Sequence, residues 1–156
     1  KNNYDIQIIL IGDGPDKAQL IKLAKNKGLG NVTFVNSQKR EKMPAIWASA
    51  DIALIPLKQH IPGSVPSKLY EAMSSSVPIV LIAEGEASSI VKNANCGKAV
   101  LPGDIDSLKE VIDLFYNDYK IRNEYGENGR ISVCEDFNRK TILKNFSNYL
   151  ESNVNN

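Results

Sequence analysis

The sequence predicts an α/β domain in which a parallel sheet of about five strands carries helices on both faces. Short runs rich in Ile, Val and Leu alternate with longer segments whose apolar residues recur at helical spacing. Gly, Pro and Asn separate these segments, and no internal repeat or low-complexity linker interrupts them. Strands that alternate with helices in this way form parallel βαβ units with right-handed crossovers.

The length of 156 residues fits one domain with a full core. Apolar residues make up 42% and charged residues 24%, which is ordinary for a globular protein. The net charge of +1 gives no electrostatic reason to expect binding to nucleic acid or to an anionic membrane. The longest apolar run, residues 79–83, is too short to span a bilayer. Cys96 and Cys134 lack metal-ligand spacing and are expected to be reduced thiols, with one disulfide as the alternative.

The predicted strands are short, and each one leads into a turn. They cover residues 6–11, 32–35, 52–56, 79–82 and 98–101. The first is nearly continuous in apolar residues, as expected of a strand buried on both faces. The predicted helices follow Pro15 up to about Lys27, begin at residues 65–67, and cover residues 41–49, 86–93, 105–116, 119–134 and 138–151.

Residues 63–83 combine a loop, a helix start and the buried strand 79–82. Pro66 suits the first helical position, because its fixed φ fits the helix and its missing N–H is not needed there. The free amides of a helix N-terminus bind anions readily. Glu71 lies one turn past Ser67, where a carboxylate can reach a sugar hydroxyl. These contacts suit a nucleotide sugar, although any strand–helix unit that starts with Pro has the same pattern.

In a parallel sheet, ligands bind beyond the carboxyl ends of the strands. Gly12 and Gly14 follow the first strand and allow close backbone approach, but the third glycine and the downstream acid of a dinucleotide site are absent. A nicotinamide or flavin cofactor is therefore not expected. His60 is expected to be a solvated loop residue rather than a general base. Trp47 lies at core spacing, so it is expected to pack in the core rather than to stack on a base.

The order of four sequence segments is characteristic of one protein family. The segments are IGDGP, KGLGNVTFVNSQKREKMPAIWASADIALIPL, VPSKLYEAMSSSVPIVLIAEGEASSIVKNANCGKAVLPGD and YGENGRISVCEDFNRKTILKNFSNYLE. They resemble the carboxyl-terminal half of a retaining, GT-B type glycosyltransferase of the large bacterial family 4, whose members build capsule, O-antigen or exopolysaccharide. The resemblance covers about residues 6–150. It implies one three-layer, Rossmann-like domain over residues 1–151, half of a GT-B fold, followed by a frayed tail at 152–156.

The resemblance implies that this half binds a nucleotide-diphosphate sugar as the donor. Glu71 matches the glutamate that holds the ribose hydroxyls. The amides around Val65, Ser67 and Lys68 match the helix start that faces the diphosphate. The ammonium group of Lys68 adds a charge near the phosphates in this interpretation, and a solvated or structural lysine is an equal alternative.

Other positions match the donor-facing loops of the family. Gly12 and Gly14 match the glycine turn near the donor, and Ser37 lies in the loop where the base is read through backbone groups. The family's first glutamate, which contacts the donor sugar, should occupy position 63, where this chain has Gly63. Glu86 lies in the loop that faces the donor sugar and is the candidate to take over that role. No other catalytic residue can be assigned.

The resemblance also implies partners outside this sequence. The donor half of the family usually begins with a further strand–loop–helix unit, and an amino-terminal domain binds the acceptor. The chain is therefore expected to be a fragment that is inactive alone. No metal, cofactor, nucleic acid or transmembrane segment is expected, and uridine diphosphate is the first and guanosine diphosphate the second expected carrier. The expected location is cytoplasmic, with the complete protein peripheral at the inner face of the membrane.

The expected function is transfer of a sugar to a glycan or lipid-linked acceptor in bacterial surface polysaccharide synthesis. One alternative is half of a split transferase that works with a separate partner chain. Another is a non-catalytic nucleotide-binding module, which the missing glutamate at Gly63 favours. A nucleotide-sugar epimerase is a weaker rival, because its catalytic acids have no counterpart here.

Overall fold

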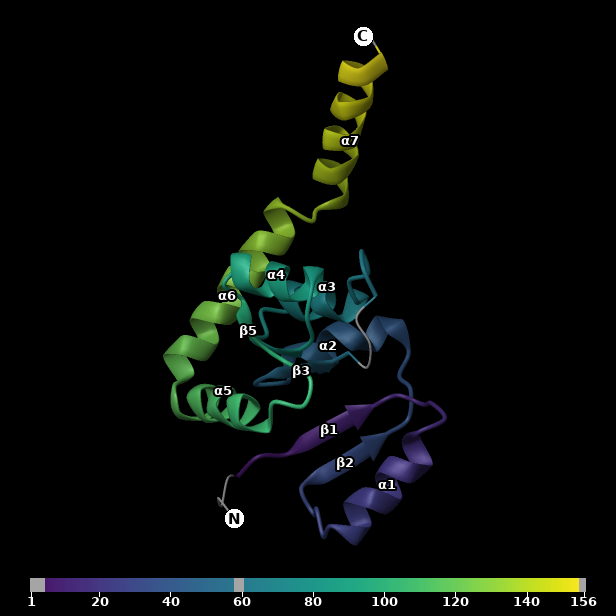
Figure 1. The fold of residues 1–156 in the computed structure, drawn as a ribbon, viewed down its shortest axis with the longest axis vertical. Helices are drawn as coiled ribbons and strands as arrows, with labels where there is room; N and C mark the ends of the chain where they lie inside the picture. The colour runs from purple at the N-terminus through teal and green to yellow at the C-terminus, as the bar shows by residue number, and fades with distance from the viewer. Residues whose placement is uncertain (1–4, 58–60, 155–156) are drawn as a thin grey trace. The chain divides into compact units, whose positions relative to one another are not determined.

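The computed structural model describes residues 5–57 and 61–154. The chain divides into two compact units, Lys1–Met43 and Pro44–Asn156 (Figure 1). Each unit is a set of parallel strands joined by helices, as the sequence predicts. Within the described residues, none of the helices combines the length and the apolar composition needed to cross a membrane.

The first unit is built on one parallel strand pair. It contains β1 (Ile8–Ile11), α1 (Lys17–Asn26), β2 (Val32–Val35) and the short 3₁₀-helix η1 (Arg40–Lys42). Ile8 lies opposite Val32, and the register continues to the ends of both strands. Gly28 directly follows the last turn of α1 with φ 65°, a left-handed conformation that ends helices and favours glycine.

The expectation that the first strand is buried on both faces is wrong. Ile9 is 59% exposed and Leu10 is 39% exposed. β1 has a single neighbouring strand in its sheet. Within the described part of this unit, Ala24 is the only buried hydrophobic residue. One strand pair and one long helix provide too little apolar material to cover both faces of β1.

The second unit is built on a three-stranded parallel sheet in which β4 is central. Its elements are α2 (Met43–Ala48), which begins at the unit boundary, β3 (Ala53–Pro56), α3 (Ser67–Ser74), β4 (Ile79–Ile82), α4 (Glu86–Asn93), β5 (Gly97–Val100), α5 (Ile105–Asn117), α6 (Tyr119–Glu135) and α7 (Arg139–Val154). The strand order β3–β4–β5 and right-handed crossovers place α3 and α4 on the same face of this sheet.

The central strand β4 is buried on both faces. Ile79 and Leu81 are buried in one cluster with Leu69 of α3 and Val91 of α4. Val80 points to the opposite face and is also fully buried. Helix α5 contacts both β4 and β5. Helices therefore cover both faces of this sheet, and the predicted α/β class is confirmed.

The predicted single sheet of about five strands is wrong in one respect. All five strands occur, but their hydrogen bonds divide them into the pair β1–β2 and the triplet β3–β4–β5. Apolar runs along a sequence indicate which segments are buried strands, and they do not specify which strands pair.

Two glycines let α6 approach the end of α3 closely. A Cβ atom at Gly126 would lie 2.2 Å from the backbone oxygen of Ser76, and Gly129, one turn later, is buried as well. Arg130 reinforces the contact, because its Nη1 donates to the backbone oxygen of Ser74 at 3.0 Å. The segment YGENGR therefore serves helix packing.

The two cysteines are free, as expected from their spacing. Cys96 is buried and Cys134 is exposed. The Cys96 thiol donates to the backbone oxygen of Val91 at 3.8 Å. Burial raises the pKa of Cys96 to about 11. Cys96 is therefore a protonated, apolar member of the core at neutral pH.

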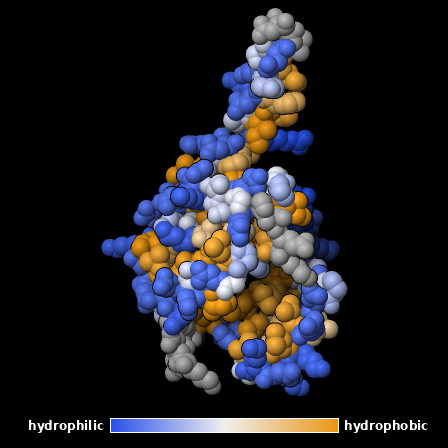
Figure 2. All heavy atoms as spheres, in the orientation of Figure 1, coloured by the Kyte–Doolittle hydropathy of each residue, from blue (hydrophilic) through white to orange (hydrophobic). Residues whose placement is uncertain are grey.

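The last helix, α7, carries apolar side chains on its surface. Figure 2 shows hydrophobic residues along this helix, and their exposed fractions lie between 44% and 64%. They are Ile142, Leu143, Phe146, Tyr149 and Leu150. The helix continues to Val154, beyond the predicted end at residue 151.

Candidate functional site

The carboxyl ends of β3 and β4 open onto the same edge of the three-stranded sheet, because parallel strands end together. Helix α3 begins at this edge with Ser67. Pro66 is the N-cap residue, with φ −68° and ψ 134°, rather than the first helical residue that the sequence predicts. Its side chain makes no cap hydrogen bond to the first turn. The start of α3 therefore presents backbone amides that the N-cap side chain does not satisfy.

The predicted donor-binding residues of this helix start lie where the sequence places them. Val65 packs against the hydrophobic core, and Ser67 and Lys68 are exposed. The helix start therefore follows a residue packed against the core and is itself exposed at Ser67 and Lys68. His60, from the same loop, lies outside the described residues.

Glu71 lies one turn inside α3 and is half-buried. Its Oε2 accepts a hydrogen bond from Nε1 of Trp47, in α2, at 3.3 Å. Trp47 also packs against the core of the second unit, so its predicted core position is confirmed. The sequence did not predict the hydrogen bond between Trp47 and Glu71, because no local pattern relates two residues 24 positions apart.

Glu86 connects the loop after β3 with the start of α4. Its Oε1 accepts a hydrogen bond from the backbone N–H of Gly63 at 3.0 Å. Gly63 has φ 76°, a left-handed conformation that disfavours side chains. A Cβ at Gly63 would meet no heavy atom within 4 Å. A carboxylate from residue 86 therefore lies beside position 63, where the family resemblance leads one to expect a glutamate.

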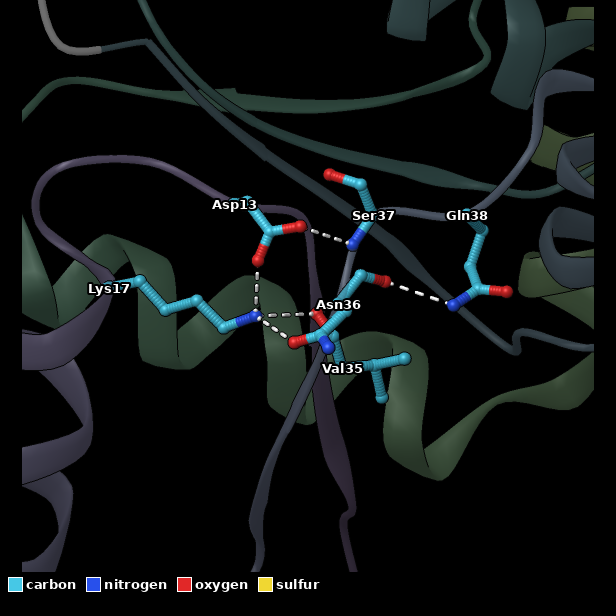
Figure 3. Close-up of polar contacts among 6 residues, drawn as sticks. All are labelled: Asp13, Lys17, Val35, Asn36, Ser37 and Gln38. Atoms are coloured by element: carbon cyan, nitrogen blue, oxygen red, sulfur yellow. Dashed lines mark hydrogen bonds and ion pairs between the residues drawn. The ribbon is translucent and has the colours of Figure 1, made fainter.

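In the first unit, a charged network joins the turn after β1 to the loop after β2 (Figure 3). Asp13 Oδ1 accepts from Lys17 Nζ at 2.7 Å, and Oδ2 accepts from the backbone N–H of Ser37 at 2.7 Å. Lys17 Nζ also donates to Oδ1 of Asn36 at 2.7 Å. The hydrogen bond from Lys17, followed by that from Ser37, lowers the pKa of Asp13 to about 2.

The other predicted residues of this unit surround that network. Gly12 donates its N–H to the backbone oxygen of Val35 at 3.1 Å and has φ 148°. A Cβ at Gly12 or at Gly14 would meet no heavy atom within 4 Å, so this turn faces open space. The Ser37 amide, a predicted ligand contact, is already bonded to Asp13. The i,i+4 spacing of Asp13 and Lys17 was the available sequence signal for the network.

The second unit also contains a groove of about 410 Å³ between α4 and α6. Its lining includes Ile90, Ala94, Ile131 and Phe137, and none of the predicted site residues. Across residues 5–57 and 61–154, no group of three or more His, Cys, Asp or Glu side chains is placed to hold a metal ion.

Comparison with known proteins identifies relatives that match most of the chain. Residues 1–132 match the family model described as glycosyl transferases group 1. N-acetyl-alpha-D-glucosaminyl L-malate synthase of Bacillus anthracis is 25% identical over 143 residues, which are 91% of this chain and 36% of that protein. O-antigen chain mannosyltransferase C of Escherichia coli is 23% identical over 146 residues, 92% of this chain and 38% of that protein. The chain thus spans less than two-fifths of the length of either relative.

Solved structures show the same fold. The crystal structure of Anabaena Alr3699/HepE in complex with UDP superposes with a TM-score of 0.80 at 22% identity, over 94% of this chain and 41% of that chain. The likeness confirms the predicted half of a GT-B fold. Since the family model covers most of the sequence, the chain belongs to the glycosyl transferases group 1 family.

Proposed function

We propose that the chain is the donor-binding half of a glycosyltransferase that moves a sugar from a nucleotide-diphosphate sugar to a glycan or lipid-linked acceptor. The observation that carries the proposal is the edge of the three-stranded sheet. There, the uncapped start of α3 is accompanied by the carboxylates of Glu71 and Glu86. Amides bind phosphate and carboxylates accept from hydroxyls, which are the two kinds of group that a nucleotide sugar presents.

Each residue of this edge has one role in the proposal. The amides around Val65, Ser67 and Lys68 bind the diphosphate, with the charge of Lys68 adding attraction. Glu71 accepts hydrogen bonds from the ribose hydroxyls. Glu86, held at Gly63, accepts from hydroxyls of the donor sugar and is the one candidate catalytic group.

The relatives support the choice of ligand and pathway. Alr3699/HepE was crystallised with UDP, which makes uridine diphosphate the first carrier to test. The mannosyltransferase relative acts on an O-antigen chain by its name, which supports a role in surface polysaccharide synthesis. Gly12, Gly14 and Ser37 stay predictions from the family resemblance, as contacts to the donor.

Transfer of the sugar requires more than the residues at the carboxyl ends of β3 and β4. Glycosyl transfer needs stabilisation of the departing diphosphate and a positioned acceptor. The proposal assigns the diphosphate to this chain and the acceptor to another domain, so the chain alone binds donor without transferring sugar. A non-catalytic nucleotide-binding module is the second candidate, because Gly63 supplies no side chain.

A thermal-unfolding titration with UDP, GDP, dTDP and ADP tests the proposal. A ligand at a hundred times its dissociation constant adds about 2.7 kcal/mol to the free energy of unfolding, which raises the melting temperature. We expect one diphosphate, UDP first, to raise it, and Glu71→Ala to remove most of the shift. Glu110→Ala, an exposed carboxylate on α5, is the matched control and should keep the shift.

The sugar-facing role is tested by a second titration with UDP-glucose. Glu86→Gln should weaken the binding of UDP-glucose and leave the binding of UDP unchanged. Asp106→Asn, which removes an equivalent first-turn charge from α5, is the control and should change neither affinity. No shift with any of the four diphosphates would contradict the donor site as a whole.

A further inference from the structure

Trp47 is the only tryptophan of the chain, and its indole N–H donates to the carboxylate of Glu71. Both side chains are half-buried, and the indole ring packs against the core. A buried indole N–H needs an acceptor. Here the acceptor is a charged side chain at the carboxyl edge of the sheet, rather than a backbone carbonyl of the core.

We propose that Trp47 is a positioning residue, which holds Glu71 in the orientation that accepts hydrogen bonds from the ribose of the nucleotide. The inference rests on the proposed function, because it concerns the same donor site. Trp47 touches no ligand in this scheme and acts through Glu71.

The physical argument starts from the flexibility of glutamate. A free glutamate side chain loses rotamer freedom when it is fixed by a ligand, and that loss weakens binding. The indole fixes Oε2 of Glu71 before the ligand arrives. Oε1 receives no hydrogen bond within the described residues. A carboxylate with one oxygen anchored and the other available is preorganised for a hydroxyl.

The arrangement also makes Trp47 a reporter of its own function. A hydroxyl that binds to Glu71 changes the electrostatic surroundings of the indole N–H. Because the chain has no other tryptophan, a change of tryptophan emission on ligand binding comes from Trp47.

A double-mutant cycle on UDP binding, measured by calorimetry, separates positioning from general packing. The four proteins are the unmodified chain, Trp47→Phe, Glu71→Ala and the double variant. Trp47→Phe keeps an aromatic ring in the core and removes the N–H. We expect Trp47→Phe alone to weaken UDP binding roughly three- to tenfold. In the double variant, Trp47→Phe should cause no additional loss of UDP affinity relative to Glu71→Ala.

Phe137→Leu is the control for loss of packing. Phe137 is another partly buried aromatic residue against the same core, and its ring contacts Tyr70 rather than Glu71. It should lower the melting temperature without changing the affinity for UDP. If Glu71→Ala binds UDP too weakly for calorimetry, the same four proteins are compared by the shift of their melting temperatures at higher UDP concentration.

The outcomes are distinct. Equal effects of Trp47→Phe with and without Glu71 overturn the positioning role, as does an unchanged affinity in Trp47→Phe. If UDP binds, Glu71→Ala weakens it and Trp47→Phe does not, the donor site stands and only this inference fails. If neither UDP nor the other diphosphates bind, the donor site and the role of Trp47 fail together.

Tryptophan emission provides a second readout that does not require Trp47→Phe to fold. The unmodified chain should change its emission as UDP is added, with the same midpoint as the calorimetric titration. Glu71→Ala should lose that change at equal occupancy. Constant emission during binding overturns the proposed contact between the ligand and Glu71, the acceptor of the indole N–H.

Discussion

Asp13 links the turn after β1 to the loop after β2 through Lys17 and Ser37. These contacts favour the charged form, and the pKa of Asp13 falls from 3.8 to about 2. A carboxyl whose folded pKa lies below its unfolded value stabilises the fold fully above the unfolded value. That stabilisation is lost as the pH falls through the folded value.

We therefore expect the stability contribution of Asp13 to be complete above pH 3.8 and to disappear as the pH falls toward 2. Carboxyl chemical shifts measured by NMR should give a titration midpoint for Asp13 near 2. In thermal melts, Asp13→Asn should lower the melting temperature at pH 6. The difference in melting temperature between the variant and the unmodified chain should disappear as the pH falls toward 2. An Asp13 midpoint at the ordinary value would contradict the network.

At this scale, the sequence predicted residue types better than residue contacts. Glu71 was identified from its place one turn into a predicted helix, and Glu86 was identified from the family resemblance. Their partners, Trp47 and Gly63, are 24 and 23 positions away along the chain. Such pairs form only when separate elements pack, so no local periodicity reveals them. Asp13 and Lys17 are closer, but their shared contact with the loop after β2 is equally non-local.

Among the elements, α6 and α3 depend on a glycine at their crossing. An exposed helical glycine is about 1 kcal/mol less favourable than alanine, so replacement usually stabilises a helix. At Gly126 the sign should reverse, because the added Cβ would lie 2.2 Å from the backbone oxygen of Ser76. We expect Gly126→Ala to reduce the free energy of unfolding by about 1–3 kcal/mol.

Denaturant unfolding monitored by circular dichroism measures this change. Asn123→Ala is the control, because Asn123 is an exposed residue of the same helix and should change stability little or raise it slightly. An unchanged or increased stability of Gly126→Ala would mean that the helices separate easily and that the close approach has little energetic value.

Most elements were predictable from the periodicity of apolar residues and from the Gly, Pro and Asn residues that separate the elements. The strands β2 and β4 and the helix α4 have the predicted bounds. The start of α3 differs by one residue, because Pro66 adopts an extended conformation with ψ 134° and occupies the N-cap position instead of the first helical position. Proline fixes φ but leaves ψ free, so its presence marks a helix start without specifying the first helical residue.

For the whole molecule, the distribution of buried side chains predicts unequal local stability. β4 lies between two strands and is buried on both faces, whereas the described part of the first unit buries one hydrophobic residue, Ala24. Native-state hydrogen exchange should therefore find the slowest amides in β4 and clearly faster exchange in β1 and β2. Equal protection of β1 and β4 would show that the chain opens as a single cooperative unit.

The division of the strands explains why this level was the hardest to predict. The alternation of strands and helices correctly indicated parallel pairing and helices on both faces. It did not indicate that β1 and β2 would form their own pair. Strand pairing depends on how complete βαβ units pack, and a sequence of short apolar runs is compatible with one sheet or with two.

The contrast between the two thiols has a practical consequence for spectroscopy. Cys134 is exposed on α6, while Cys96 is buried with a pKa of about 11, so a thiol-reactive dye should attach at one position without any mutation. An acceptor dye at Cys134 would pair with the single indole donor at Trp47. The unmodified chain thus provides an intrinsic donor and a single labelling site for resonance energy transfer. With them, changes in the distance between α2 and α6 can be followed in solution.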